Sequence, residues 1–259
     1  MFSLNPSLQS YSWGSKTLIA DLRGEESPTQ HPQAELWYGA HPAAPADIAG
    51  VPLTDIIAAD PDRELGAAVR ARFGDRLPFL LKILAVAEPL SLQAHPSLAQ
   101  AQEGFQRENA QGIDVRAGNR NYRDDNHKPE LIVALTPFHA MAGFRPLAAT
   151  LELFAALDCP SLARYVGMID STGEEAVNLR MLFTTWITIP AAVRKQLIDD
   201  IIVAAKRVVA EGSAAEWQRE TLANIIELDT HYPGDVGVLG ALLLNYVRLE
   251  PGEGIYLDA

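Results

Sequence analysis

Apolar runs in the first part of the chain are short and interrupted. Up to about residue 146, Gly and Pro residues separate them, which is typical of short strands joined by turns. Leu77–Val86 and Leu131–Leu135 are near-continuous apolar runs, and this pattern predicts two buried strands. The stretch between them, residues 96–125, is polar and predicts a short helix and a long loop, a loop length that is often functional.

The apolar spacing then changes to that of a helix. Residues 147–228 carry apolar positions three or four apart, which predicts a helical region. Pro190 precedes the second of the two clearest series, where a proline suits the start of a helix. The two series are Leu147, Leu151, Phe154 and Leu157, and then Val193, Leu197 and Ile201.

Strand character returns near the end of the chain. Leu244–Leu249 is rich in apolar residues, Glu250–Gly254 has the composition of a turn, and Ile255–Leu257 resembles the start of another strand. These segments predict a hairpin with no further strand as partner.

The order of these strand-like and helical segments predicts the fold class. Strand-rich, helical and again strand-rich segments suggest a β domain that a helical insertion interrupts. We therefore predict a mainly β fold with an α insertion. The predicted divisions are a β domain at 1–146, a helical insertion at 147–228 and a return to β structure at 229–259.

Composition narrows the class of protein further. Hydrophobic residues make up 48% of the 259, enough for a sizeable core, and we expect neither a membrane span nor a secretory signal. Cys159 is the single cysteine, so an internal disulfide and a thiolate metal cluster are excluded, and a cytoplasmic location is expected. The net charge of −12 disfavours nucleic acid and anionic membranes. Any phosphorylated ligand would need a local basic pocket.

Leu90–His95 is the first segment that could carry chemistry. In a strand, alternate side chains share a face, so Ser91, Gln93 and His95 would lie together. One explanation is a bound metal, for which His offers a nitrogen and Gln an amide oxygen. The other is a half-exposed strand whose polar face is solvated.

His127-Lys128-Pro129-Glu130 is the second such segment. Lys128 and Glu130 are two residues apart, so an extended backbone would place them on one face. A lysine beside a metal-bound carboxylate would suit a site that holds an anion. The alternative is a surface Lys–Glu pair of little energetic value.

Two further residues are candidates for binding. Lys82 lies inside an apolar run, where lysine is rarely buried without a partner. Its ammonium either reaches water along its stem or faces a pocket that needs positive charge. Trp13 precedes Gly14 and belongs either to the core or to the wall of a sugar pocket.

Taken together, five segments are far more specific than any one alone. They are Tyr11-Ser12-Trp13-Gly14, Ala34-Glu35-Leu36-Trp37-Tyr38-Gly39-Ala40-His41-Pro42, Pro89-Leu90-Ser91-Leu92-Gln93-Ala94-His95-Pro96, Asn126-His127-Lys128-Pro129-Glu130-Leu131 and His231-Tyr232-Pro233-Gly234-Asp235. In this order they resemble the type I mannose-6-phosphate isomerases, over nearly the whole chain. The resemblance implies a cupin-type β-barrel (jelly roll) with a helical domain, and zinc-dependent interconversion of mannose 6-phosphate and fructose 6-phosphate.

The resemblance also implies roles for particular residues. Zinc would be held by Gln93, His95 and Glu130, and by a later His. The expected catalytic residues are His127, Lys128 and Lys82. The expected substrate-binding residues are Ser91, Lys82, Lys128 and Trp13. The expected partner is a small-molecule sugar phosphate, with no nucleic acid, no membrane and a monomeric state favoured.

The chain departs from the family pattern at its end. In the family, the later His and an active-site Arg follow a stretch that resembles residues 251–259. We therefore expect little or no isomerase activity from these 259 residues alone. The first rival hypothesis is a non-catalytic cupin that binds a sugar phosphate. The second is a metal-dependent cupin oxygenase, which predicts iron and a site richer in His.

Overall fold

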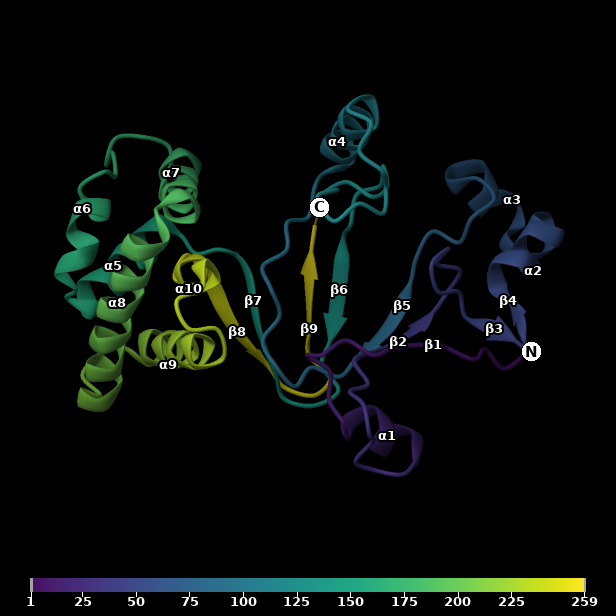
Figure 1. Cartoon of the computed structure of the whole chain (residues 1–259), viewed down its shortest axis with the longest axis horizontal. Helices are drawn as coiled ribbons and strands as arrows, with labels where there is room; N and C mark the ends of the chain where they lie inside the picture. Colours follow the sequence, from purple (N-terminus) through teal and green to yellow (C-terminus); the bar gives the residue numbers. More distant parts are fainter. Residues whose placement is uncertain (1, 259) are drawn as a thin grey trace. The chain divides into compact units, whose positions relative to one another are not determined.

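The structure is a computed structural model that describes residues 2–258, and Figure 1 shows the order of its elements. The chain forms two compact units, Met1–Leu90 and Ser91–Ala259. The domain boundaries expected at residues 146 and 228 concern a different division and stay predictions. Among the described residues, no single helix is long and apolar enough to cross a membrane. Glu175–Thr188 and Ala191–Glu211 would reach that length and apolarity only as a pair bent by 116°.

An antiparallel sheet of three strands forms the centre of the first unit. Its order is β1-β2-β5, and its small core contains Ile19, Leu36 and Ala85. The strands are β1 (Ser7–Gln9), β2 (Glu35–Tyr38) and β5 (Leu81–Leu84), with a second pair, β3 (Asp47–Ile48) and β4 (Val51–Pro52). The helices are α1 (Leu18–Arg23), α2 (Leu53–Ala59) and α3 (Pro61–Phe73).

The apolar run Leu77–Val86 contains a strand, but the strand is not buried as predicted. Leu81–Leu84 pairs with β2, Val86 forms an isolated bridge with Gly14, and β5 is an outer strand of its sheet. Ile83 packs against the small core, whereas Leu81 is 59% exposed. Leu81 and Ile83 are two residues apart and therefore share a face of β5, so this face is covered at Ile83 but not at Leu81.

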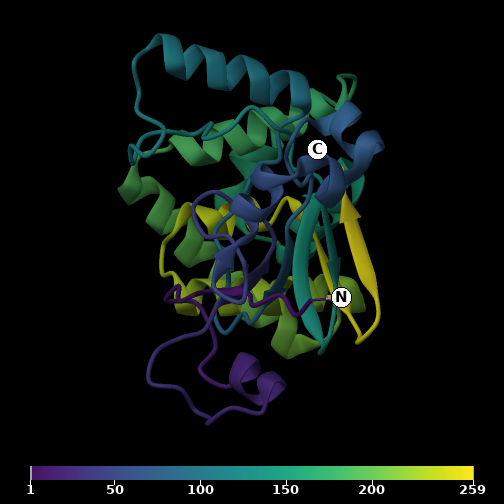
Figure 2. The ribbon, with the colours of Figure 1, turned by 90° about the vertical axis from the view of Figure 1, so that its right-hand side faces the viewer.

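Two pairs of strands form the β structure of the second unit. β6 (Glu130–Val133) pairs with β9 (Gly254–Leu257), and β7 (Phe138–Phe144) pairs with β8 (Leu244–Leu249), both antiparallel. Figure 2 shows β6 and β9 side by side. The strands at both ends of the predicted hairpin are confirmed, but the hairpin itself is wrong. β8 and β9 pair with the consecutive strands β7 and β6 and not with each other.

The turn between β8 and β9 continues this pairing. The Gly252 amide donates to the Ala134 carbonyl at 2.8 Å, and the Ala134 amide donates to the Glu253 carbonyl at 2.9 Å. The strand predicted at Leu131–Leu135 is present but is not buried. Leu131 is 68% exposed, and β6 pairs with β9 alone among the described strands.

Helices provide most of the remainder of the second unit. α4 (Leu98–Ala110) begins after Ser97, which forms a capping box with Gln100. The helical period from Leu147 onward is confirmed, and Pro190 is the N-cap residue of α8. The helices are α5 (Leu147–Leu157), η1 (Pro160–Leu162), α6 (Ala163–Val166), α7 (Glu175–Thr188), α8 (Ala191–Glu211), α9 (Glu216–His231) and α10 (Val236–Ala241).

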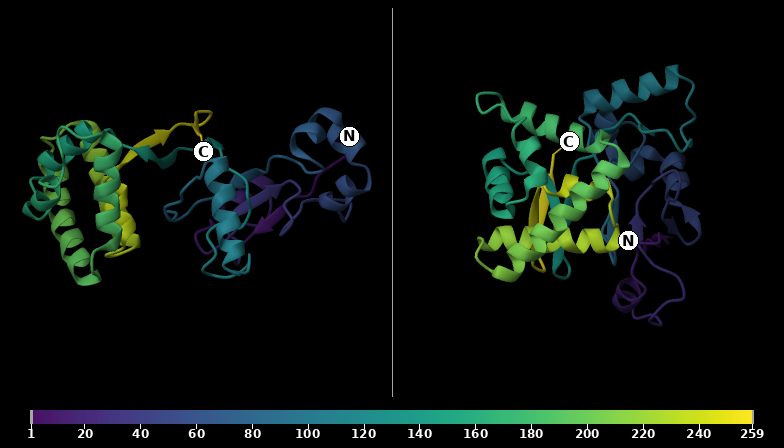
Figure 3. Two further views of the ribbon diagram at one scale, coloured as in Figure 1. Left: turned by 90° about the horizontal axis from the view of Figure 1, so that it is seen from above. Right: turned by 60° about the vertical axis from the view of Figure 1, so that its left-hand side comes forward.

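The helices from α5 to α10 enclose the largest core. Leu153, Trp186, Ile198 and Leu222 are fully buried there, and Figure 3 shows these helices gathered together. Helices hold more of the described residues than strands do, which differs from the mainly β content expected. Within residues 2–258 the strands form one three-stranded and three two-stranded sheets, without a closed barrel.

Candidate functional site

His95 and Glu130 meet in the second unit. His95 precedes α4, and Glu130 is the first residue of β6. The Nε2 atom of His95 lies 3.7 Å from Oε2 of Glu130. Their side chains are 18% and 46% exposed, so a small ligand could reach both. Two of the three residues that the resemblance assigned to zinc are therefore adjacent.

A backbone carbonyl orients the His95 ring. Nδ1 of His95 lies 2.7 Å from the carbonyl oxygen of Lys128. A carbonyl oxygen can only accept a hydrogen bond, so Nδ1 must donate its proton. In the neutral ring, Nε2 then carries the free lone pair, and it faces Glu130. Metal-binding histidines are commonly oriented in this way.

Gln93 lies two residues before His95 and is exposed. The strand expected at Leu90–His95 is absent, because residues 87–97 have no ladder partner. Side-chain packing holds this segment instead. A Cβ atom on Gly240 in α10 would lie 2.6 Å from Cδ1 of Leu92, so glycine permits close contact between Leu92 and that helix.

Lys128 and His127 lie just before β6 and are both exposed. Nζ of Lys128 lies 2.7 Å from Oδ2 of Asp124. The alternative of a surface pair between Lys128 and Glu130 is therefore not what forms. Glu130 faces His95 and Lys128 faces Asp124, which leaves one carboxylate beside the imidazole.

Lys82 lies in the first unit, on β5 opposite Trp37 of β2. Its Nζ is 3.6 Å from Oε2 of Glu35 and 4.8 Å from the centroid of the Trp37 ring. The indole nitrogen of Trp37 donates to the same Glu35 oxygen at 2.6 Å. Lys82 thus has a partner within its apolar run, and its side chain is still 34% exposed.

Glu35 was not identified from the sequence as a polar partner in this cluster. Its side chain is 9% exposed, which is unusual for a carboxylate without such contacts. The only signal in the sequence was the alternation of Glu35, Leu36 and Trp37, which cannot show that Lys82 lies on the neighbouring strand. Cross-strand register decides this contact.

Trp13 also belongs to the first unit and stacks on Tyr11, with ring centroids 5.6 Å apart. Burial, and the nearby charge of Glu35, raise the pKa of Tyr11 above its ordinary value. Gly14 allows this segment to approach Ala34, since a Cβ atom on Gly14 would lie 2.6 Å from the Ala34 Cα. Ser91 is exposed at the start of the second unit.

The donors in the second unit suit a divalent metal. Gln93, His95 and Glu130 offer one nitrogen and two oxygen atoms, and zinc binds such nitrogen and oxygen donors. Bonds of about 2.0–2.2 Å at tetrahedral angles place ligand atoms roughly 3.4 Å apart, close to the 3.7 Å between His95 and Glu130. Within residues 2–258, no three His, Cys, Asp or Glu side chains form such a group. The third donor of the candidate set is the Gln93 amide, which the resemblance assigned.

Solved structures share this fold. A crystal structure of mannose 6-phosphate isomerase from Salmonella typhimurium, bound to substrate (F6P) and zinc, matches with a TM-score of 0.84 and 38% identity. The match covers 100% of this chain and 64% of that one. The apo form from the same organism matches with the same TM-score. The fold is thus that of the mannose-6-phosphate isomerase structures.

Sequence relatives agree with the structures. Mannose-6-phosphate isomerase of Escherichia coli (strain K12) is 40% identical over 266 residues, covering 100% of this chain and 64% of the relative. The Homo sapiens enzyme of that name is 31% identical, covering 100% and 63%. The family model for the phosphomannose isomerase type I catalytic domain matches residues 1–147. The chain belongs to the type I phosphomannose isomerase family, and it spans slightly less than two thirds of these relatives' length.

Proposed function

We propose that this chain carries the metal- and substrate-binding part of a zinc-dependent aldose–ketose isomerase. Its substrates would be mannose 6-phosphate and fructose 6-phosphate. The observation that carries the proposal is the approach of His95 and Glu130 to 3.7 Å, in a chain of the type I phosphomannose isomerase family. The names of solved relatives add support, since one holds zinc and F6P together.

In this proposal Gln93, His95 and Glu130 would hold the zinc. When bound, zinc would polarise the sugar carbonyl and stabilise the negative charge of the enediolate. The Lys128 carbonyl keeps the proton of His95 on Nδ1, so that Nε2 is free to coordinate. Glu130 supplies negative charge beside it, which partly balances a divalent cation.

The remaining residues would act on the sugar. The reaction removes a proton from C2 of the open-chain aldose and returns one to C1 through a cis-enediol, so it needs a base within hydrogen-bond reach. We assign ring opening or proton transfer to His127, and attraction of the phosphate or the enediolate to Lys128. Lys82 would attract the phosphate, while Ser91 and Trp13 would line the pocket. These lysines would supply positive charge in a chain of net charge −12.

We further propose that the small sheets belong to a cupin-type β-barrel and that the protein acts in the cytoplasm as a monomer. The likeness to isomerase structures supports the fold. The single, buried Cys159 suits a reducing compartment. A small-molecule sugar phosphate would be the partner, without nucleic acid or membrane. No observation favours a non-catalytic cupin or an oxygenase, since the relatives are named as isomerases.

The test is a coupled assay of mannose 6-phosphate conversion, made on this chain continued to the length of its relatives. We expect activity that a chelator abolishes and added zinc restores. The variant E130Q should lose at least about 100-fold in rate, the usual cost of removing one preorganised electrostatic group. Absence of activity in the zinc-loaded protein would contradict the proposal, as would full activity of E130Q.

A further inference from the structure

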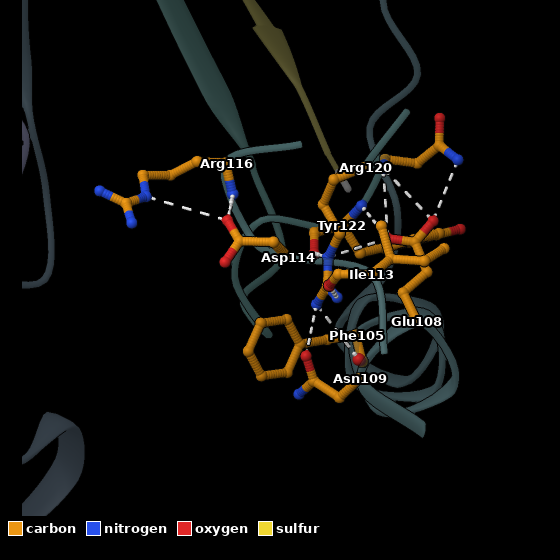
Figure 4. A network of polar contacts seen from close by, with 9 residues as sticks. Phe105, Glu108, Asn109, Ile113, Asp114, Arg116, Arg120 and Tyr122 are labelled. Carbon is orange, nitrogen blue, oxygen red and sulfur yellow. Dashed lines mark hydrogen bonds and ion pairs between the residues drawn. The ribbon is translucent and has the colours of Figure 1, made fainter. Parts of the chain in front are cut away.

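A buried ion pair links helix α4 to the loop that leads to Glu130. Nε of Arg120 lies 3.0 Å from Oε2 of Glu108, and the two side chains are 0% and 5% exposed. Figure 4 shows this pair and its neighbours. Among the ion pairs of residues 2–258, no other has both side chains so deeply buried. Burying two charges is costly unless further hydrogen bonds satisfy them.

The Arg120 guanidinium donates hydrogen bonds to backbone carbonyls before and after it in the loop. Nη1 donates to the Ile113 carbonyl at 2.8 Å, and Nε donates to the Tyr122 carbonyl at 2.5 Å. Nη2 donates to Oδ1 of Asn109 at 2.8 Å, and the guanidinium lies 5.0 Å from the Phe105 ring centroid. The side chain therefore joins the end of α4 to the middle of the loop.

The Glu108 carboxylate accepts hydrogen bonds from the two loop residues that follow Arg120. The donors are the Tyr122 backbone amide, at 2.8 Å, and the Asn121 side-chain amide, at 3.0 Å. The Tyr122 hydrogen bond is the largest influence lowering the pKa of Glu108, with help from Asn121 and Arg120, against the desolvation that raises it. Glu108 is consequently ionised at neutral pH and paired.

Gly104 of α4 and Tyr122 of the loop are in close contact beside this ion pair. A Cβ atom on Gly104 would lie 2.5 Å from atoms of the Tyr122 ring, so only glycine allows the ring to lie there. The Arg107 guanidinium lies 5.7 Å from the same ring centroid. Tyr122 is thereby held against one turn of α4.

The held loop ends at the candidate metal site. Asp124 follows Tyr122 closely and accepts from Nζ of Lys128 at 2.7 Å. The Lys128 carbonyl then accepts from His95 at 2.7 Å, and His95 itself stands just before α4. The segment 95–130, which contains α4 and the loop, thus begins at His95 and ends at Glu130, the two residues of the candidate pair.

We propose that Glu108 and Arg120 are positioning residues that set the placement of Glu130 and the Lys128 carbonyl relative to His95. A long loop without secondary structure has many conformations, and ordering it costs entropy. The buried pair removes that freedom in advance, so that the metal ligands are already close together when zinc arrives. This inference rests on the proposed function, because it assumes that these ligands hold zinc.

The test compares zinc affinity, by competition with a chromophoric chelator, in the 259-residue chain and its variant E108Q. We expect zinc to bind about 10-fold more weakly to E108Q, in line with the loss of groups that orient ligands. The matched control is D114N, which changes charge equally in the same loop, where Asp114 and Arg116 form a pair 69% and 93% exposed. Its zinc affinity should equal that of the parent chain.

A double-mutant cycle distinguishes positioning from general stability. In the E130Q background, E108Q should weaken zinc binding by a smaller factor than in the parent chain, because one of the two groups that it positions has been altered. Hydrogen exchange of metal-free protein should also show faster exchange at the Tyr122 amide in E108Q. If E108Q does not fold, N109A removes a single bond to Arg120 and should weaken zinc binding by a smaller factor.

The outcomes separate this inference from the proposed function. A parent chain that does not bind zinc contradicts the metal site itself. A parent that binds zinc, with folded E108Q and N109A of unchanged affinity, overturns the positioning role alone. An equal loss from E108Q with and without E130Q would also overturn it, since the effect would then not act through Glu130.

Discussion

At the scale of residues, His95 and Lys82 have partners that the sequence did not reveal. His95 and Glu130 could be named from the resemblance, but the Lys128 carbonyl that orients His95 could not. A backbone contact leaves no mark in a pattern of side chains. Lys82 was noticed as an isolated charge, and its partners Glu35 and Trp37 lie on a neighbouring strand. Register, which local sequence does not encode, brings them together.

The two candidate lysines allow a prediction about phosphate. K82M and K128M should weaken binding of mannose 6-phosphate far more than binding of mannose, because only the phosphate needs their charge. The control is K195M, since Nζ of Lys195 lies 2.7 Å from Asp199, as that of Lys128 does from Asp124. Calorimetric titrations with zinc present measure both ligands. Equal losses for mannose and its phosphate would contradict the assignment.

At the scale of elements, periodic segments were predicted well and pairing was not. The helical spacing of Leu147–Leu157 and the proline before α8 correspond to observed helices, because such patterns follow from local geometry. The strand expected at Leu90–His95 is absent, although its alternation was regular. Alternation permits a strand, but a strand also needs a partner edge. The chain supplies Leu92 packing on Gly240 instead.

Gly104 allows a test of the contact between α4 and the loop that contains Tyr122. Replacing a glycine within a helix by alanine ordinarily stabilises it by about 1 kcal/mol. At Gly104 the new Cβ would meet the Tyr122 ring at 2.5 Å, and overpacking of this kind costs about 1–3 kcal/mol. We therefore expect G104A to lower the free energy of unfolding, measured with urea.

The control for this variant lies in the loop that follows the same helix. Gly118 has open space around its Cβ position and no left-handed backbone. G118A should change the free energy of unfolding by less than about 0.5 kcal/mol, as surface substitutions usually do. A G104A protein as stable as the parent would show that Tyr122 is not held against α4.

At the scale of the whole molecule, two features were not predicted from the sequence. The chain divides after Leu90, inside a run of apolar and polar residues that shows no compositional break. Leu131 and Leu81 are largely exposed, although their apolar runs predicted burial. Burial depends on which surfaces a strand meets, and composition alone does not determine this. The net charge of −12 still predicts an obstacle to phosphate binding, which the candidate lysines would have to overcome.

The most direct test of the account is the zinc affinity of the 259-residue chain and its variant H95A, with H31A as control. His31 is exposed in the first unit, away in sequence from the candidate ligands. Elemental analysis and chelator competition should find zinc in the parent and in H31A. H95A should bind at least about 100-fold more weakly, because even groups that only orient ligands contribute 10–100-fold. Equal zinc affinity in H95A, or no zinc in the parent, would contradict the site.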